Sequence, residues 1–459
     1  MFELDESKIK NILKNTKAPS ERELELILEK AEKKKGLELE ETASLLQLKR
    51  ENKKQIESLF RTAGKVKNEI YGNRIVLFAP LYISDYCVND CEYCGFHCRN
   101  KTLDRKRLTT KEISEETSQI IKMGHKRILL EAGEHPDTSI DYVCDAIRTI
   151  YETKIGNGEI RRVNVNIAAT TTENYKKLKD AGIGTYQLFQ ETYHQETYKM
   201  LHSGPKADYE RQITAHERAF GAGIDDYGIG VLFGLYDYRF EVLSLLDHAK
   251  YMEKKYGVGP HTISVPRLCL APGVAYSAQC PVSSFDFLKL IAAIRLSVPY
   301  TGMIISTRET AEIRAKAFEI GISQTSAASR TSPNGYSKKQ NPNTDVQFEI
   351  ADERSVQEVV SSLMRQGHVP SFCTACYRSR RTGDAFMKLA KAGNINHMCR
   401  PNAILTFKEY LMDYADMGMK REGDALIEKE IGRIEDQDRR LETRKRLKLI
   451  ENGQRDLFF

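Results

Sequence analysis

The sequence predicts an α/β protein built on a (β/α)8 barrel of the TIM type, with an N-terminal helical extension and a C-terminal, mainly helical domain. Three observations lead to this prediction. Strand-like and helix-like segments alternate eight times between residues 74 and 328, charged helical patterns precede them, and a polar segment without periodicity follows them. A barrel of eight units takes roughly 250 residues, so the length fits. A partly open barrel of six units is the alternative.

The N-terminal helical extension is predicted for residues 1–72. The segment ERELELILEKAEKK and the run 52–71 place apolar residues three to four positions apart, which is the period of an α-helix with one buried face. We expect one large catalytic domain that carries this segment as an extension.

The barrel itself is predicted for residues 73–333. Its strands are short apolar or β-branched runs, and helix-like segments such as TKEISEETSQIIKMG and SSFDFLKLIAAIRL separate them. The predicted strands are 74–83, 127–132, 162–169, 185–190, 227–234, 261–266, 302–307 and 321–328.

The C-terminal domain is predicted for residues 334–459. It opens with a polar, Pro- and Asn-rich run from Asn334 to Glu349, which indicates a long loop. Helical patterns then resume, and the run that follows Arg421 reads as one charged helix with a solvated face.

Composition limits the partners and the compartment. The net charge of +6 comes from 70 basic and 64 acidic residues spread along the chain, so no nucleic-acid partner is expected. No apolar run approaches the roughly 18 residues of a membrane span, and the first residues lack a secretory signal. We therefore expect a cytoplasmic protein with no membrane partner. In that reducing compartment, clustered cysteines indicate metal or redox chemistry, whereas the isolated Cys144, Cys269 and Cys280 favour buried structural thiols.

A first cysteine group, Cys87, Cys91 and Cys94, has the spacing C-x3-C-x2-C and follows the first predicted strand. Barrel enzymes keep their chemistry at the mouth where the strands end. Three thiolates on one short loop suit an iron–sulfur cube with one iron that lacks a protein ligand. A structural zinc is the alternative, with Cys98 as the fourth ligand that such a site needs.

With Tyr93 included, this group matches the C-x3-C-x-aromatic-C pattern and resembles the radical S-adenosylmethionine (SAM) superfamily. The resemblance implies a 4Fe–4S cluster whose open iron binds SAM, and a 5'-deoxyadenosyl radical released by one electron. It also implies SAM contacts at the ends of later strands. The candidates are Ala132, Gly133 and Glu134, which resemble the family's Gly-Gly-Glu element, together with Glu191 and Arg267.

A substrate carboxylate site is predicted where the seventh and eighth strands end. Arg308 offers a planar fork for two parallel hydrogen bonds, with Thr325 and Ser326 on the neighbouring strand. An ion pair of Arg308 with Glu309 or Glu312 is the alternative. The stretches ETYH, STRE and SPNGY resemble the aromatic-amino-acid lyase branch of the superfamily, which implies L-tyrosine or tryptophan as the substrate and Arg308 as the carboxylate's partner.

A second cysteine group, Cys373, Cys376 and Cys399, has the spacing C-x2-C-x22-C. By spacing alone, a zinc site that includes His397 and an iron–sulfur cluster are equally good interpretations. With CYRSRRTGDAF between the cysteines, the pattern resembles the tyrosine-lyase family of [FeFe]-hydrogenase H-cluster maturases over nearly the whole chain. That resemblance implies a second 4Fe–4S cluster.

His261 is the first residue of the sixth predicted strand, at the mouth of the barrel opposite to Cys87. A strand of about six residues spans roughly 20 Å, so the two cysteine groups cannot share one bound substrate. A histidine that caps the strand or bonds a carbonyl is the ordinary interpretation. The resemblance implies instead that His261 ligates an additional labile iron at the second cluster, together with a free cysteine.

Taken with the resemblance, the sequence predicts a lyase that cleaves L-tyrosine to p-cresol and dehydroglycine. Dehydroglycine would pass through the barrel, where Asn164 and Asn166 would line a polar channel, and yield carbon monoxide and cyanide for an Fe(CO)2(CN)-cysteine unit. A reductant such as ferredoxin or flavodoxin and other hydrogenase maturases are the implied partners. Two alternatives are a 2-iminoacetate synthase for thiamine thiazole and a zinc-stabilised barrel that binds a partner.

Overall fold

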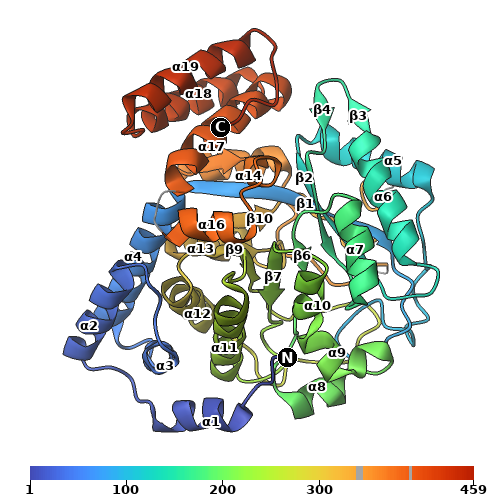
Figure 1. Cartoon of the computed structure of the whole chain (residues 1–459), viewed down its shortest axis with the longest axis vertical. Helices are drawn as coiled ribbons and strands as arrows, with labels where there is room; N and C mark the ends of the chain where they lie inside the picture. The colour runs from blue at the N-terminus through green and yellow to red at the C-terminus, as the bar shows by residue number, and fades with distance from the viewer. Residues whose placement is uncertain (338–344, 392–394) are drawn as a thin grey trace.

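The computed structural model describes residues 1–337, 345–391 and 395–459, and a closed parallel barrel lies at its centre (Figure 1). Strand β10 pairs with β1, which closes the barrel. The eight-stranded prediction is therefore confirmed, and the alternative of an open barrel of six units is wrong. The barrel strands are β1 (Arg74–Ser84), β2 (Arg127–Ala132), β5 (Arg162–Asn166), β6 (Tyr186–Gln187), β7 (Tyr227–Gly230), β8 (Thr262–Ser264), β9 (Gly302–Ile305) and β10 (Gln324–Ser326).

Helices surround the barrel, and many begin at a side chain that caps the first turn. Thr109, Ser139, Thr171, Ser283 and Thr310 each accept a hydrogen bond from a main-chain N–H of the helix that they precede. The helices are α5 (Thr110–Lys122), α6 (Ile140–Glu152), α7 (Thr172–Asp180), α8 (Gln195–Leu201), α9 (Tyr209–Ile213), α10 (Ala215–Gly221), α11 (Tyr238–Tyr256), α12 (Ser284–Ser297) and α13 (Ala311–Ile320). A 3-10 turn, η1 (Pro205–Ala207), and a hairpin of β3 (Lys154–Ile155) and β4 (Gly158–Glu159) complete this part.

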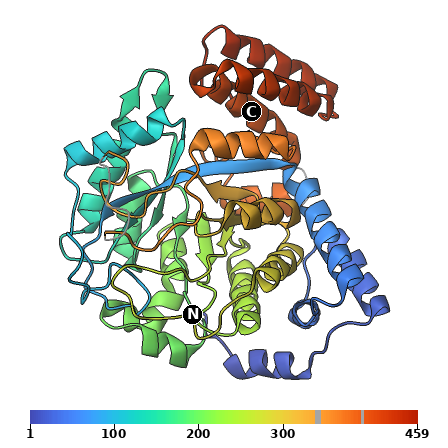
Figure 2. The same ribbon diagram turned by 180° about the vertical axis from the view of Figure 1, so that it is seen from behind.

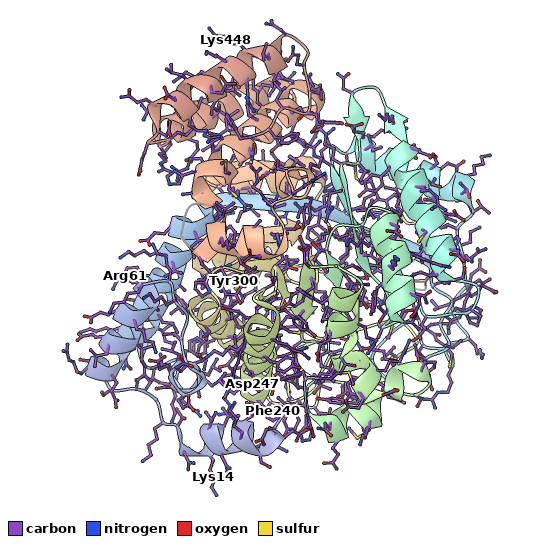
Figure 3. The ribbon with its side chains drawn as sticks, in the orientation of Figure 1. Lys14, Arg61, Phe240, Asp247, Tyr300 and Lys448 are labelled. Carbon is purple, nitrogen blue, oxygen red and sulfur yellow. The ribbon has the colours of Figure 1, made fainter. Side chains whose placement is uncertain are left out.

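The N-terminal extension is helical, as predicted. It consists of α1 (Glu6–Asn15), α2 (Glu21–Glu32), α3 (Leu39–Leu46) and α4 (Lys53–Tyr71). Its first helix is fastened to α11: Lys8 pairs with Asp247 at 2.9 Å, and the ammonium group of Lys10 lies 5.8 Å from the ring centroid of Phe240 (Figure 3). The extension therefore packs on the barrel helices.

The region after the barrel is mainly helical and is joined to the barrel by one strand. Its elements are α14 (Val356–Arg365), β11 (Val369–Ser371), α15 (Ala375–Arg378), α16 (Gly383–Lys391), α17 (Ile395–Tyr414), α18 (Met417–Gly432) and α19 (Gln437–Glu451). Strand β11 pairs in parallel with Arg74–Val76, the first residues of β1. This pairing fixes the C-terminal helices to the mouth where the strands begin. The loop predicted from Asn334 to Glu349 falls partly outside the described residues.

The charged run after Arg421 forms two helices, so the prediction of one helix is wrong. Helix α18 ends at Gly432, which lowers helix stability, and α19 begins after Asp436, whose carboxylate accepts a hydrogen bond from the N–H of Arg439 at 2.8 Å. Figures 1 and 2 show the two helices side by side at the end of the molecule away from α1. Lys448 on α19 lies at the outer edge of the molecule (Figure 3).

The inside of the barrel carries polar side chains along β5. Val163 and Val165 face the outer helices, so the alternation of a strand turns Arg162, Asn164 and Asn166 inward. The Asn164 side chain accepts a hydrogen bond from the N–H of Thr185 at 3.1 Å. An apolar cluster of Phe78, Leu129 and Ile304 lies inside as well. The interior is therefore mixed in polarity, unlike the branched aliphatic layers of an ordinary barrel.

Candidate active site and second cysteine site

The first cysteine site, defined as Cys87, Cys91 and Cys94, lies on the loop after β1, at the mouth where the strands end. All three residues line one pocket that reaches into the barrel. The loop rests directly on the end of β2, because a Cβ atom at Gly133 would lie 2.3 Å from the carbonyl oxygen of Tyr86. Only glycine allows the two chain segments to approach so closely.

Burial favours the neutral form of the Cys91 and Cys94 thiols. It raises the pKa of Cys91 well above its ordinary value and that of Cys94 to about 11, because a thiolate loses its hydration there. Bound iron would hold the thiolates in place of those protons. Among the described residues no fourth cysteine lines the pocket; Cys98 is half-buried and is not part of its wall. Three sulfur donors fit a cube with one open iron, whereas a structural zinc takes four protein ligands.

Charged side chains border the thiols within the same pocket. The carboxylate of Glu134 accepts hydrogen bonds from Asn89 (2.7 Å) and Arg211 (2.6 Å), and Glu191 pairs with Lys206 at 2.7 Å. Glu191 has a φ angle of 69°, a left-handed conformation that costs roughly 1–2 kcal/mol for a residue with a side chain. Backbone strain of this kind is typical of binding sites. The pocket wall includes the expected Ala132, Gly133, Glu134 and Glu191.

Arg308 and two serines lie at another part of the same pocket. The guanidinium of Arg308 lies 3.2 Å from the ring centroid of Phe348, and both residues line the pocket. Ser306 and Ser326 also line it, and the Ser326 hydroxyl accepts a hydrogen bond from the N–H of Thr307. A stacked guanidinium with hydroxyls beside it presents a fork for a carboxylate.

The ion pairs that were the alternative for Arg308 are not formed among the described residues. Glu309 pairs with Arg267, and Glu312 pairs with Lys316 at 2.7 Å. The guanidinium of Arg267 also donates to the carbonyl of Val282 at 2.9 Å. Arg267 was expected to contact SAM or a carboxylate, but Glu309 occupies its fork and it is not part of the pocket wall.

Thr325 also has a different environment from the one expected. Successive residues of a strand face opposite sides, so Ser326 faces the pocket while Thr325 faces the outer helices. The Thr325 hydroxyl donates to the carbonyl of Ile305 at 2.9 Å and accepts from Arg314 at 2.7 Å. Ser326, and not Thr325, is therefore the hydroxyl available beside Arg308 in the pocket.

A carboxyl group that the sequence did not single out also belongs to the pocket. Glu131 lies one residue before the end of β2 and lines the wall beside Tyr82. Loss of hydration raises the pKa of Glu131 to about 7, although the Tyr82 hydroxyl and the Arg308 charge act in the opposite direction. The pocket therefore holds a fixed cation and an acid that can change its charge near neutrality.

The second cysteine site, defined as Cys373, Cys376 and Cys399, lies at the mouth where the strands begin. Cys373 follows β11, Cys376 belongs to α15 and Cys399 belongs to α17. Arg74, the first residue of β1, donates a hydrogen bond to the Cys399 sulfur at 3.2 Å. Burial raises the pKa of Cys373, and it raises that of Cys376 to about 12.

Within the described residues, no three His, Cys, Asp or Glu side chains are gathered around one point for a single metal ion.

His261 lies at this same mouth and touches the segment that carries Cys376. Its ring stacks on Phe386 with centroids 4.1 Å apart and on Tyr377 with centroids 5.7 Å apart. Its Nδ1 atom lies 3.2 Å from the Asp226 carboxylate. The guanidinium of Arg162 lies 3.1 Å from the ring centroid of Tyr377. His261 therefore lies beside Tyr377, the residue after Cys376, at the mouth opposite to Cys87.

Solved structures that match the whole chain decide the family. The crystal structure of HydG, a maturase of the [FeFe]-hydrogenase, superposes with a TM-score of 0.95 at 52% sequence identity and covers 99% of each chain. The [FeFe]-hydrogenase maturase HydG from Carboxydothermus hydrogenoformans superposes with a TM-score of 0.84 at 39% identity, over 96% of this chain and 97% of that one. The chain belongs to the HydG family.

Two sequence profiles and a curated relative place the HydG family within a wider group. The Radical SAM superfamily profile matches residues 81–248, and the Biotin and Thiamin Synthesis associated domain matches residues 264–369. The 2-iminoacetate synthase of Salmonella typhimurium is 32% identical over 318 residues, which is 69% of this chain and 82% of that protein. Membership of the radical SAM superfamily implies SAM and a 4Fe–4S cluster as cofactors.

Among the described residues, none of the helices has the length and apolar character that a membrane span requires.

Sequence reasoning missed several pocket residues of this HydG-family chain. Glu131 has the same strand parity as Arg127, which also faces the barrel interior, so its inward position could have been derived from β2 alone. Lys206 is the middle residue of the 3-10 turn η1, and no motif marks it. Lys206 reaches the pocket because the chain folds back and brings it to Glu191. Sequence periodicity does not predict such a contact.

Proposed function

We propose that this chain is a radical SAM carbon–carbon lyase that cleaves L-tyrosine to p-cresol and dehydroglycine, and then converts dehydroglycine to carbon monoxide and cyanide for [FeFe]-hydrogenase H-cluster maturation. The observation that carries the proposal is the pair of cysteine sites at opposite mouths of one barrel, one of them beside a pocket with an arginine and a carboxyl group. The full-length match to HydG structures supports it.

At the first site, Cys87, Cys91 and Cys94 would hold a 4Fe–4S cluster, with SAM against Ala132, Gly133, Glu134 and Glu191. The bound cluster and SAM together would supply the radical that begins the reaction. Lys206 neutralises Glu191, and Asn89 and Arg211 fix Glu134, so the residues that meet SAM are held before it binds.

Tyrosine binds in the remainder of that pocket. Arg308, stacked on Phe348, takes the substrate carboxylate through two parallel hydrogen bonds, with Ser326 beside it. Glu131, when charged, accepts a hydrogen bond from the substrate's ammonium group and can take a proton from it. A cation and an anion in one pocket match the two charges of an α-amino acid.

At the second site, Cys373, Cys376 and Cys399 would hold a second 4Fe–4S cluster, with an additional labile iron and a bound cysteine. His261 is the proposed protein ligand of that iron. Asp226 faces Nδ1 of His261, so a proton held there would leave Nε2 as the metal-binding nitrogen. The resulting Fe(CO)2(CN)-cysteine unit would pass to other hydrogenase maturases, and a ferredoxin or flavodoxin would supply electrons.

Dehydroglycine must travel between the two mouths, and β5 offers a polar row for that passage. Asn166 lines the pocket of the first site, Asn164 lies inside the barrel, and Arg162 lies against Tyr377 at the second site. A guanidinium at the far end of the row would attract the carboxylate of dehydroglycine.

The second candidate function is that of a 2-iminoacetate synthase for thiamine thiazole, which the similarity to the Salmonella enzyme favours. It shares the tyrosine cleavage and differs in the fate of dehydroglycine.

The test is an anaerobic assay of the reconstituted chain with SAM, dithionite and tyrosine. The proposal predicts p-cresol, cyanide and carbon monoxide. Cresol without carbon monoxide would favour the 2-iminoacetate synthase, and a lack of cresol would exclude tyrosine as the substrate.

A further inference from the structure

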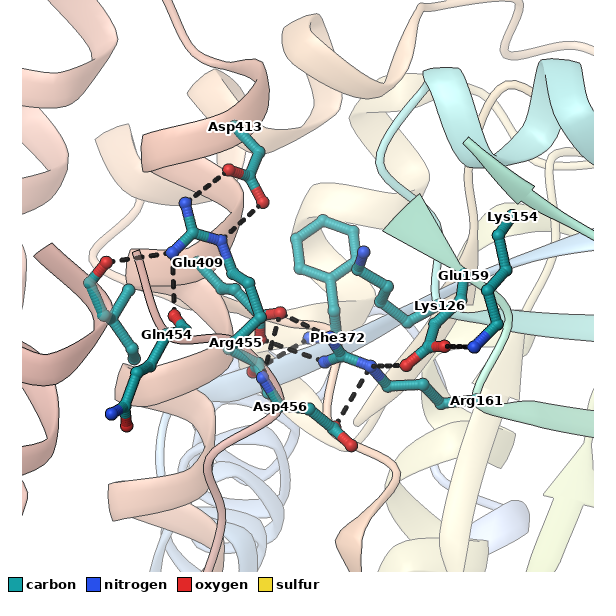
Figure 4. A network of polar contacts seen from close by, with 12 residues as sticks. Lys126, Lys154, Glu159, Arg161, Phe372, Glu409, Asp413, Gln454, Arg455 and Asp456 are labelled. Atoms are coloured by element: carbon teal, nitrogen blue, oxygen red, sulfur yellow. Dashed lines mark hydrogen bonds and ion pairs between the residues drawn. The ribbon is translucent and has the colours of Figure 1, made fainter. Parts of the chain in front are cut away.

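Residues 454–459, called the tail below, follow α19 and fold back across the outside of the second cysteine site. Figure 4 shows their first part: Arg455 reaches Asp413 on α17, and Asp456 lies beside Arg161 of the barrel. Arg455 binds Asp413 through two hydrogen bonds of 2.8 and 2.6 Å. The tail is therefore fixed to α17 before it reaches the cysteine-bearing segments.

Asp456 joins three parts of the fold. Its carboxylate lies 3.1 Å from Nε of Arg161, directly before β5, and accepts a hydrogen bond of 2.7 Å from Arg378, two residues after Cys376. Its N–H donates to Glu409 on α17 at 3.3 Å. Asp456 has a φ angle of 64°, a strained conformation that these contacts compensate.

The buried Arg161 side chain links the barrel, α17 and the tail through its ion pairs. It is 3% exposed and pairs with Glu409, Glu159 and Asp456 (Figure 4). Removal of one carboxylate from a buried ion network leaves part of the guanidinium charge uncompensated. Loss of Asp456 therefore weakens the contact of the barrel with both α17 and the segment after Cys376.

The two phenylalanines of the tail bind the same segments. The guanidinium of Arg378 lies 4.2 Å from the ring centroid of Phe458, and Arg381 donates to the main-chain oxygen of Phe459. The N–H of Phe459 donates to the side chain of Asn402 at 2.8 Å. Asn402 is buried and lies three residues after Cys399 on α17.

Two arginines of α19 enclose the last ring. Arg439 and Arg446 place their guanidinium groups 4.7 and 4.0 Å from the ring centroid of Phe459. A guanidinium over an aromatic ring is attracted by the negative charge of the ring face. Helix α19, which buries Leu447 and Ile450, thereby anchors the tail.

We propose that the tail is a strap that positions Cys376 and Cys399, so that residues far from either thiol determine how firmly the second cysteine site holds iron. The strap touches residues two and five positions after Cys376 and three positions after Cys399. Movement of the Cys376 segment would also move Tyr377, which covers His261 and Arg162. The inference rests on the proposal that the second site binds an iron–sulfur cluster.

The test isolates the second site in the full-length chain. In a background with Cys87→Ala, Cys91→Ala and Cys94→Ala, the iron left after anaerobic reconstitution belongs to the second site. We expect Asp456→Asn to release this iron to a chelator about tenfold faster, which is the effect typical of residues that orient metal ligands. We also expect a changed electron paramagnetic resonance signal of the reduced cluster. Phe459→Ala is the second variant, because it leaves the charge around Arg161 intact.

The matched control is Arg444→Ala, which removes the exposed pair between Arg444 on α19 and Glu428 on α18 without touching the tail. Release rates and spectra equal to this control in both Asp456→Asn and Phe459→Ala would overturn the strap. If the three-alanine background itself holds no iron, the proposed second cluster is wrong, and the proposal that the tail positions it is wrong as well. If Asp456→Asn does not fold, Phe459→Ala alone decides the question.

Discussion

The two cysteine sites of this barrel are built in opposite ways. Cys87, Cys91 and Cys94 come from one loop at the end of β1, held in place by the close approach of Gly133. Cys373 follows β11, Cys376 lies on α15 and Cys399 lies on α17, and residues distant in sequence, such as Arg74 and those of the tail, contact Cys399 or the segment after Cys376. A local motif thus forms the first site, whereas the second depends on tertiary packing.

Loss of a thiol at the first cysteine site should abolish every product. Cys91→Ala removes one of three thiolates from a cluster that would generate the radical, so p-cresol, cyanide and carbon monoxide all fall to background. The products are measured under anaerobic conditions with SAM and dithionite. Cys144→Ala, which alters an isolated buried thiol of α6, serves as the control and should keep all three.

A selective effect is expected at the second site. Cys399→Ala should keep p-cresol formation and lose carbon monoxide, because tyrosine cleavage uses only the opposite mouth. Product ratios from the same assay measure it. Equal loss of p-cresol and carbon monoxide would contradict the division of labour between the two sites.

A substitution in the substrate pocket should impair tyrosine cleavage and leave the chemistry of the second site unchanged. Arg308→Ala should lower kcat/KM for tyrosine about a hundredfold, since hydrogen bonds between charged groups are worth about 1.5–3 kcal/mol. Carbon monoxide per cresol should stay constant, because the second site is untouched. Lys316→Ala removes an exposed cation of α13 and is the control; an equal loss there would show a nonspecific charge effect.

The smallest effect concerns pH. Because the pKa of Glu131 is raised to about 7, the carboxyl group is neutral below that pH and charged above it. If the charged form binds the substrate's ammonium group, kcat/KM for cresol formation rises as the pH increases through about 7. Glu131→Gln should abolish that rise. An unchanged profile in the variant would remove Glu131 from substrate binding.

The sequence was sufficient for what is local. Eight alternating segments predicted the closed barrel. The C-x3-C-x2-C spacing predicted that Cys87, Cys91 and Cys94 act together at the mouth where the strands end, and all three line one pocket there. The inward face of β5 also follows from strand alternation, as Asn164 illustrates.

What the sequence did not contain depends on contacts between distant segments. The pairing of Arg267 with Glu309 and the outward turn of Thr325 follow from strand register and neighbouring helices. The break between α18 and α19 was signalled by Gly432 and Asp436, which the charge pattern obscured. Sequence periodicity also does not predict the contact of the tail, which follows α19, with Arg378.

Two iron–sulfur sites at opposite mouths of one barrel are tested most directly by a count of iron and sulfide paired with product analysis. We expect about eight cluster irons per wild-type chain, about four after Cys373, Cys376 and Cys399 are all changed to alanine, and undiminished p-cresol from that variant. Only about four irons in the wild-type chain, or loss of p-cresol in the variant, would contradict it.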